Sequence, residues 1–154
     1  MNEHQKEVFS NPALLREKLG IYLQTPEKVE IYAESFEKFF EAGNRNEIKF
    51  KATWSWWALF GGLFFYLYRK DYKMAIIYFI LSLIPIVSLV ALLIPAYAKY
   101  SICDKFCKAL ALNNDEFLKN EGGVNKWAIY LAVVLFVLVI CLILFAASIG
   151  AYSY

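Results

Sequence analysis

The sequence is poor in the residues that most enzymes and metal sites use. It has one histidine, His4, and three cysteines, of which Cys103 and Cys107 form a C-x-x-x-C pair and Cys141 stands alone. A single histidine near the start of the chain leaves no Ser-His-Asp or Cys-His arrangement within it. Zinc takes four ligands in structural sites, and the sequence has no second cysteine pair to complete a set. We therefore expect no catalytic residue, no metal site, no cofactor and no enzymatic activity.

The chain also lacks a strong excess of charge of either sign. Lys and Arg number 16 against 14 Asp and Glu, which gives a formal net charge of +2. That balance is too small to favour nucleic acid as a partner. The opening residues, MNEHQKEVFSNPALLREKLG, lack the apolar core of a signal peptide, so we expect the first apolar helix to act as an uncleaved insertion signal.

Two long stretches, residues 74–98 and 127–152, contain no Asp, Glu, Lys, Arg or His. Each is longer than the roughly 20 residues that a helix needs to cross about 30 Å of hydrocarbon. A helix satisfies its own backbone hydrogen bonds in lipid, where no water is present to do so. The pattern predicts an all-α membrane protein with two long transmembrane helices. Pro85 and Pro95 are expected to kink the first of them.

A shorter apolar segment, residues 54–68, reads WSWWALFGGLFFYLY. As a straight helix it would measure about 22 Å, which is less than the thickness of the hydrocarbon. Trp54, Trp56 and Trp57 at one end and tyrosines at the other resemble the aromatic belts of two membrane interfaces. We predict a short transmembrane helix here. The alternative is a re-entrant or interfacial segment that is broken at the two central glycines.

The distribution of Lys and Arg favours the crossing. If residues 54–68 span the membrane, residues 1–53 and the amphipathic connection 99–126 share one side. Eight basic residues near the membrane lie on that side: Arg45, Lys49, Lys51, Lys99, Lys105, Lys108, Lys119 and Lys126. The other side then holds three, Arg69, Lys70 and Lys73. The positive-inside rule thus predicts a multi-pass protein with a cytoplasmic region 1–53, a membrane domain 54–154 and the N-terminus in the cytoplasm.

The N-terminal region contains two amphipathic helical patterns, around residues 12–23 and from Thr25 to Gly43. Thr25 is a suitable cap, Pro26 suits a first helical turn, and Gly43 is expected to end the helix in a left-handed conformation. Aromatic residues of the second pattern recur at three- and four-residue steps and form a stripe. They are Tyr32, Phe36, Phe39 and Phe40, the candidate residues for packing against a partner protein or the connection after Lys99. The simplest expectation is an ordinary amphipathic helix packed on its own protein.

The cluster Arg69-Lys70-Asp71 separates two apolar segments. Asp71 is expected to be a solvated turn residue between two helices. Basic groups at a membrane interface attract anionic head groups. Arg69 and Lys70, together with Trp54, Trp56 and Trp57, are therefore the candidate residues for contact with the interface or with lipid head groups.

The residues Trp54, Trp56, Ala58, Gly62, Leu67-Tyr68-Arg69-Lys70 and Tyr72, preceded by FEKFFEAG and Ile48-Lys49-Phe50, form a recognisable pattern. Over roughly residues 20–95 the chain resembles a family of small bacterial membrane proteins that is catalogued as a domain of unknown function (DUF2628). It differs from that family at Leu63, where the family tends to have proline, and at Asp71, where it has an apolar residue. The resemblance implies a bacterial inner-membrane location and no established activity, cofactor or catalytic residue.

The two long stretches have no ionisable group, and such groups usually mark the ion or proton paths of transporters. We therefore expect a non-enzymatic inner-membrane protein that acts by association, as an accessory or scaffolding subunit. One alternative is a small oligomeric transport or pore-forming protein, and another is a protein that interacts with anionic lipid. The expected partners are membrane lipids, together with a protein partner or further copies of the chain.

Overall fold

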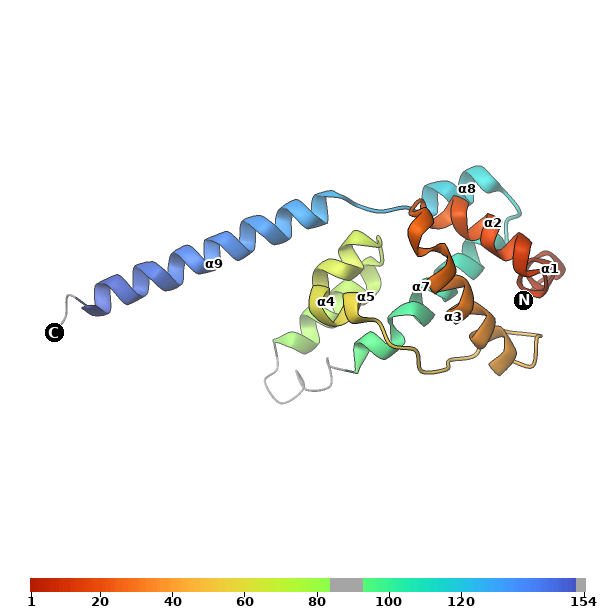
Figure 1. Ribbon diagram of the computed structural model, residues 1–154, viewed down its shortest axis with the longest axis horizontal. Helices are drawn as coiled ribbons and strands as arrows, with labels where there is room; N and C mark the ends of the chain where they lie inside the picture. The colour runs from red at the N-terminus through yellow and green to blue at the C-terminus, as the bar shows by residue number, and fades with distance from the viewer. Residues whose placement is uncertain (84–92, 152–154) are drawn as a thin grey trace.

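The computed structural model describes residues 1–83 and 93–151, and within these ranges every regular element is a helix (Figure 1). The all-helical expectation is therefore confirmed for the described residues. The elements are α1 (Glu3–Ser10), α2 (Pro12–Leu23), the 3-10 turn η1 (Pro26–Lys28), α3 (Val29–Ala42), α4 (Trp56–Tyr68), α5 (Tyr72–Ser82), α7 (Ile94–Leu110), α8 (Asp115–Glu121) and α9 (Trp127–Ala151).

Asparagine side chains begin three of these helices. Asn2 forms a capping box with Gln5 at the start of α1, and Asn11 caps α2, in which Pro12 takes the first position. Asn114 accepts a hydrogen bond from the backbone N–H of Phe117 and so caps α8. Each cap satisfies backbone donors that a helix start leaves without a partner, which makes these short helices stable enough to pack.

Helices α1, α2, α3, α7 and α8 pack around one core, and we call this unit the head. Phe36 of α3 and Phe106 of α7 are both fully buried, with ring centroids 5.6 Å apart. Phe9 of α1 contacts both of these rings. Burial of an aromatic side chain of this kind contributes about 1.5–3 kcal/mol to folding. The head therefore joins the N-terminal helices to α7 through a core to which both parts contribute.

The start and end of α3 differ from the sequence-based expectation. Thr25 makes no capping hydrogen bond, and residues 26–28 form the short turn η1 before α3 begins at Val29. Gly43 has a φ of −90°, so it is not the left-handed residue; Asn44 and Arg45 have that conformation instead. A Cβ on Gly43 would lie 1.8 Å from the carbonyl oxygen of Glu47, so the close approach of two backbone segments requires glycine here.

The prediction of two long transmembrane helices is not supported. Within the described residues a single helix, α9, is long and apolar enough to cross a membrane. Helix α5 ends at Ser82 and α7 begins at Ile94, with Pro95 in the first turn of α7 rather than at a kink. Pro85 and the rest of residues 84–92 lie outside the described residues. Residues 94–98, at the end of the apolar run, belong to α7, which continues into the head.

Helix α4 is broken at its centre, as the alternative interpretation of residues 54–68 anticipates. Gly62 has φ 47° and ψ −126°, which is not helical, so two short helical pieces meet there at a bend. A Cβ at this position would lie 3.0 Å from the hydroxyl oxygen of Tyr78. The left-handed φ and this close contact both favour glycine. A bent helix of 13 residues is too short to cross the hydrocarbon of a membrane.

The α4–α5 turn contacts parts of the chain that the predicted three-span topology places on the other side of a membrane. That topology puts Arg69 and Lys70 on the opposite side of a membrane from residues 1–53 and 99–126. In the structure, Arg69 donates a hydrogen bond to Thr25, and Lys70 donates one to the carbonyl oxygen of Gly122. The turn is therefore packed directly on the head.

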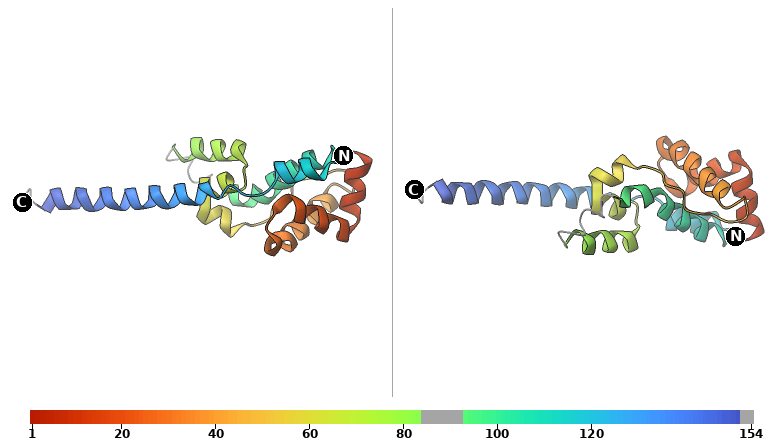
Figure 2. Two further views of the ribbon diagram at one scale, coloured as in Figure 1. Left: turned by 90° about the horizontal axis from the view of Figure 1, so that it is seen from above. Right: turned by 90° about the horizontal axis from the view of Figure 1, so that it is seen from below.

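Helix α9 projects away from the rest of the protein, so that the two termini lie at opposite ends (Figures 1 and 2). It contacts α4 through its first turns, and its side chains from Val133 to Ala146 are exposed. The link before it is held to the rest of the chain by two backbone hydrogen bonds. The N–H of Gly123 donates to the carbonyl oxygen of Tyr22 at 2.6 Å, and that of Asn125 donates to Tyr68 at 2.7 Å.

The substitution Phe36→Ala is expected to lower the free energy of unfolding by about 3–5 kcal/mol, because it opens a cavity among packed rings. The measurement is chemical or thermal unfolding of the detergent-solubilised protein, followed by circular dichroism. Ile31→Ala, on the exposed face of the same helix, is the matched control and is expected to change stability by less than about 0.5 kcal/mol. Equal losses for the two variants would contradict the assignment of Phe36 to the core.

Candidate functional site

The turn between α4 and α5 holds three charged residues in succession, Arg69, Lys70 and Asp71. Lys70 has a left-handed φ of 55°, which reverses the chain, and the N–H of Asp71 donates to the carbonyl oxygen of Tyr66 at 2.8 Å. This geometry directs the three side chains to different neighbours. Helices α4 and α5 form an apolar helical hairpin. Arg69 lies on one side of this hairpin, whereas Lys70 and Asp71 line a cleft on the other.

Asp71 is buried, with 3% of its surface exposed, so the expectation of a solvated turn residue was wrong. Its carboxylate accepts hydrogen bonds from the hydroxyl of Ser101 in α7 and from the backbone N–H of Met74. The second bond caps the start of α5. A buried carboxylate needs such partners, because an unpaired charge away from water is very costly. Asp71 thus fastens the hairpin to α7.

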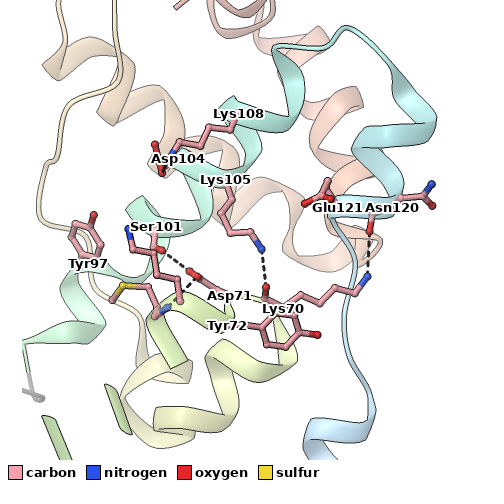
Figure 3. Close-up of a pocket in the computed structure, with 12 residues that line it drawn as sticks. Lys70, Asp71, Tyr72, Tyr97, Ser101, Asp104, Lys105, Lys108, Asn120 and Glu121 are labelled. Carbon is pink, nitrogen blue, oxygen red and sulfur yellow. Dashed lines mark hydrogen bonds and ion pairs between the residues drawn. The ribbon is translucent and has the colours of Figure 1, made fainter. Parts of the chain in front are cut away.

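Lys70 takes part in the same attachment. Its ammonium donates to the carbonyl oxygen of Gly122 at 2.7 Å and reaches that of Asn120 at 3.5 Å, both at the end of α8. The backbone of Lys70 is held as well: the ammonium of Lys105 in α7 donates a hydrogen bond to its carbonyl oxygen at 2.8 Å (Figure 3). These groups border a cleft of about 470 Å³ that also contains Asp71 and Ser101. The contacts of Lys70 are with the protein's own backbone.

Arg69 is 8% exposed and lies on the other side of the turn. One terminal nitrogen, Nη1, donates to the hydroxyl of Thr25 at 3.2 Å. The guanidinium also lies over the rings of Tyr32 and Tyr68, at 5.2 and 5.5 Å from their centroids. Its Nε is buried and has no hydrogen-bond partner among the described residues. A guanidinium offers five N–H donors, so Arg69 retains capacity for an acceptor.

A cavity of about 310 Å³ lies beside Arg69, and we call it the tryptophan pocket. Trp54, Trp56 and Trp57 line it, so the structure brings these three predicted interface residues together with Arg69 and separates them from Lys70. Lys28 and Lys99 also line the pocket, and the ammonium of Lys28 lies 5.4 Å from the ring centroid of Trp57. Burial and the charge of nearby Lys38 lower the pKa of Lys99.

Lys28 and Lys99 were missed by the sequence interpretation. Neither belongs to the apolar segments or to the basic cluster, and each arrives at the pocket from a different part of the chain, one from η1 and one from α7. The sequence contains no signal for this meeting, since it depends on how α3 and α7 pack in the head.

The aromatic stripe of α3 is inside the protein. Tyr32, Phe36, Phe39 and Phe40 are all buried. Phe36 contacts Phe106, and Phe39 contacts Tyr100 with ring centroids 5.3 Å apart, so both pack on α7, in the connection after Lys99. Because the protein's own helices already cover these rings, they form no exposed surface for a partner.

The two cysteines of the connection are unpaired and buried. Burial raises the pKa of the Cys107 thiol to about 11, and it raises the pKa of the Cys103 thiol well above its ordinary value. Across residues 1–83 and 93–151, no three His, Cys, Asp or Glu side chains gather in a way that could hold a metal ion.

Over the described residues, the fold and these cavities define a small all-helical protein with a packed head, a bent apolar hairpin and one helix that is long and apolar enough to cross a membrane. The model of the family described as "Protein of unknown function (DUF2628)" matches residues 13–112, and the chain belongs to that family. The matched residues include α2, α3, the hairpin and α7, and they end before α8 and α9. No curated protein and no solved structure matches the chain.

The raised thiol pKa values predict slow alkylation of Cys103 and Cys107. In a Cys141→Ser variant in detergent at pH 8, we expect iodoacetamide to label the native protein far more slowly than the unfolded protein, because the thiols are buried and carry little thiolate. Since the reactive thiolate of Cys107 forms only as the pH approaches about 11, the rate should still be rising above pH 9. Rapid labelling of the native protein at pH 7, measured by mass spectrometry, would contradict the burial of both thiols.

Proposed function

We propose that this is a non-enzymatic, membrane-anchored protein that acts by association at a membrane surface, as an accessory or scaffolding subunit. Helix α9 carries the proposal. It has 25 residues without a charge, and its exposed side chains from Leu131 to Ala146 are apolar. Monomeric soluble proteins rarely expose so large an apolar surface to water. Acyl chains would cover it, and Trp127 and Tyr130 at its start suit the membrane interface.

The α4–α5 hairpin supports a surface position for the head. It projects on the same side of the head as α9 (Figure 2). Several of its large apolar side chains are exposed: Trp56, Trp57, Phe60, Ile76, Phe79 and Ile80. In this arrangement the hairpin enters the membrane only partly and returns, while the head stays outside. This corresponds to the re-entrant or interfacial interpretation of residues 54–68.

The basic residues support an orientation with the head in the cytoplasm of a bacterium, as the family resemblance implies. All 16 Lys and Arg residues precede α9, and Lys126 directly adjoins its first residue. Lys and Arg close to a membrane-spanning helix favour the cytoplasmic side. With α9 as the crossing helix, the hairpin and the head lie together on that side.

An association role needs an exposed surface on the head. Leu112, between α7 and α8, and Phe117, within α8, are exposed apolar side chains beside a shallow cavity of about 320 Å³. Lys105, Lys108 and Glu121 border it. An apolar centre with a charged rim is the usual composition of a protein-binding surface. The pore-forming alternative instead requires further copies of the chain around α9.

The proposed membrane anchor is tested by determining from which side of the membrane different positions of the protein can be labelled. In the Cys141→Ser background, we expect Lys73→Cys and Asn113→Cys to react with a membrane-impermeant maleimide from the same side of the membrane, because the hairpin turn contacts the head. An epitope tag added after Tyr154 should be accessible from the opposite side. The unsubstituted background, with Cys103 and Cys107 buried, is the control for labelling. Labelling of positions 73 and 113 from opposite sides would contradict this topology and restore the three-span one.

Association is tested in polymer-bounded native membrane discs, which avoid detergent. We expect the protein to elute with at least one different polypeptide, and the double variant Leu112→Glu, Phe117→Glu to lose it, since burying two carboxylates in an apolar contact is costly. Glu34→Gln, on the exposed face of α3, is the control that should retain the partner. A complex of identical chains would favour the pore-forming alternative, and a monomer with lipid alone would contradict both.

A further inference from the structure

The tryptophan pocket adjoins a second, apolar hollow. This groove, of about 400 Å³, lies between α4 and the first turns of α9. Four residues line both spaces: Lys28, Trp57, Phe65 and Tyr68. The two spaces therefore lie side by side and together offer a candidate site, with a charged end beside Arg69 and an apolar end against α9.

The charged end is lined by cations without a negatively charged side chain among the described residues. Arg69 is more than nine-tenths buried, lines the pocket, and has an Nε with no hydrogen-bond partner among the described residues. A buried donor without a partner destabilises the protein, and the cost is greater for a charged group. Lys28 and Lys99 add two further positive charges, and no carboxylate is among the described residues that line the pocket. An acceptor with full negative charge would satisfy all three groups.

The electrostatic state of Lys99 agrees with this reading. Burial and the charge of Lys38 lower its pKa, and the carboxylate of Glu34 offsets these effects only in part. A bound anion would reverse that change by stabilising the charged ammonium.

The apolar end suits a hydrocarbon chain. Gly61 and Phe64 of α4 form one wall, and Ile129, Ala132 and Val133 of α9 form the other. The absence of a side chain on Gly61 keeps the wall open close to the backbone. Because the groove runs against the helix that we place in the bilayer, a chain within it would have direct access to the membrane interior.

We propose that the site binds one anionic phospholipid, with its phosphate against Arg69, Lys28 and Lys99 and one acyl chain in the groove between α4 and α9. This rests on the proposed membrane anchoring, which supplies the ligand. The three cations disfavour the ammonium group of a zwitterionic head group, so phosphatidylglycerol binds in preference to phosphatidylcholine. A free phosphate ion would satisfy the cations and leave the groove empty.

The test is native mass spectrometry of the full-length protein in detergent, titrated in turn with phosphatidylglycerol, phosphatidylcholine and inorganic phosphate. We expect one phosphatidylglycerol per chain, at least about tenfold tighter than phosphatidylcholine, and no retained inorganic phosphate. Equal retention of the two lipids would overturn the proposal, because it would indicate unspecific lipid around the apolar helices. Retention of inorganic phosphate as tight as that of the lipid would overturn it too.

Matched variants separate the two ends of the site. Lys28→Gln with Lys99→Gln should weaken phosphatidylglycerol binding about tenfold or more, whereas Lys73→Gln, an exposed lysine outside the pocket, should not. Val133→Trp should fill the groove and displace the lipid, whereas Val137→Trp, one turn further along α9, should not. These changes avoid Arg69, whose contacts with Thr25 also support the fold.

An unchanged affinity in the lysine double variant, or in Val133→Trp, would contradict the proposal, provided that circular dichroism shows the helices intact. Failure of the lipid-binding proposal can be distinguished from failure of the proposed membrane anchor. Maleimide sidedness reports the anchor without reference to any bound lipid, so an anchored protein that retains no lipid would overturn this inference alone.

Discussion

The packing of α3 against α7 is the contact on which the rest of the structure depends. Phe36 and Phe106 belong to segments 70 residues apart in the sequence, yet both are fully buried in one core. Since a single core cannot be divided by a bilayer, the N-terminal helices and α7 lie in the same compartment. The chain between α3 and α7 must therefore leave the head and return to the same side.

The α4–α5 turn reinforces this constraint with three charges in three residues. Asp71 bonds to α7, Lys70 to the end of α8, and Arg69 to Thr25 before η1. Each of these contacts holds the hairpin to a different part of the head. Since Lys70 and Asp71 contact other parts of the head, Arg69 lies among aromatic rings and cations. The tryptophan pocket therefore has an excess of positive charge. An attachment and a binding site thus arise from one short stretch of chain.

The sequence predicted those features that depend on local pattern. The helix over residues 12–23, the aromatic stripe of α3 and the apolar α9 all follow from periodicity or composition. The prediction of one long helix over residues 74–98 is not supported, because hydropathy alone does not distinguish a lipid environment from a protein core. Ala98, like Ile102 further along, is buried in the protein. The buried state of Asp71 and the meeting of Lys28 and Lys99 at Arg69 depend on tertiary packing between distant segments, which a single sequence does not encode in any readable pattern.

The link before α9 has a mechanical consequence. Gly123 and Asn125 donate backbone hydrogen bonds to Tyr22 of α2 and Tyr68 of α4, and a Cβ on Gly122 would lie 2.0 Å from the carbonyl oxygen of Tyr22. The chain is therefore clamped on both sides immediately before the long helix begins. This link restricts rotation between α9 and the head. With α9 in a bilayer, as proposed, a change in its tilt would turn the head with it, and the thickness of the lipid would affect the angle of the head.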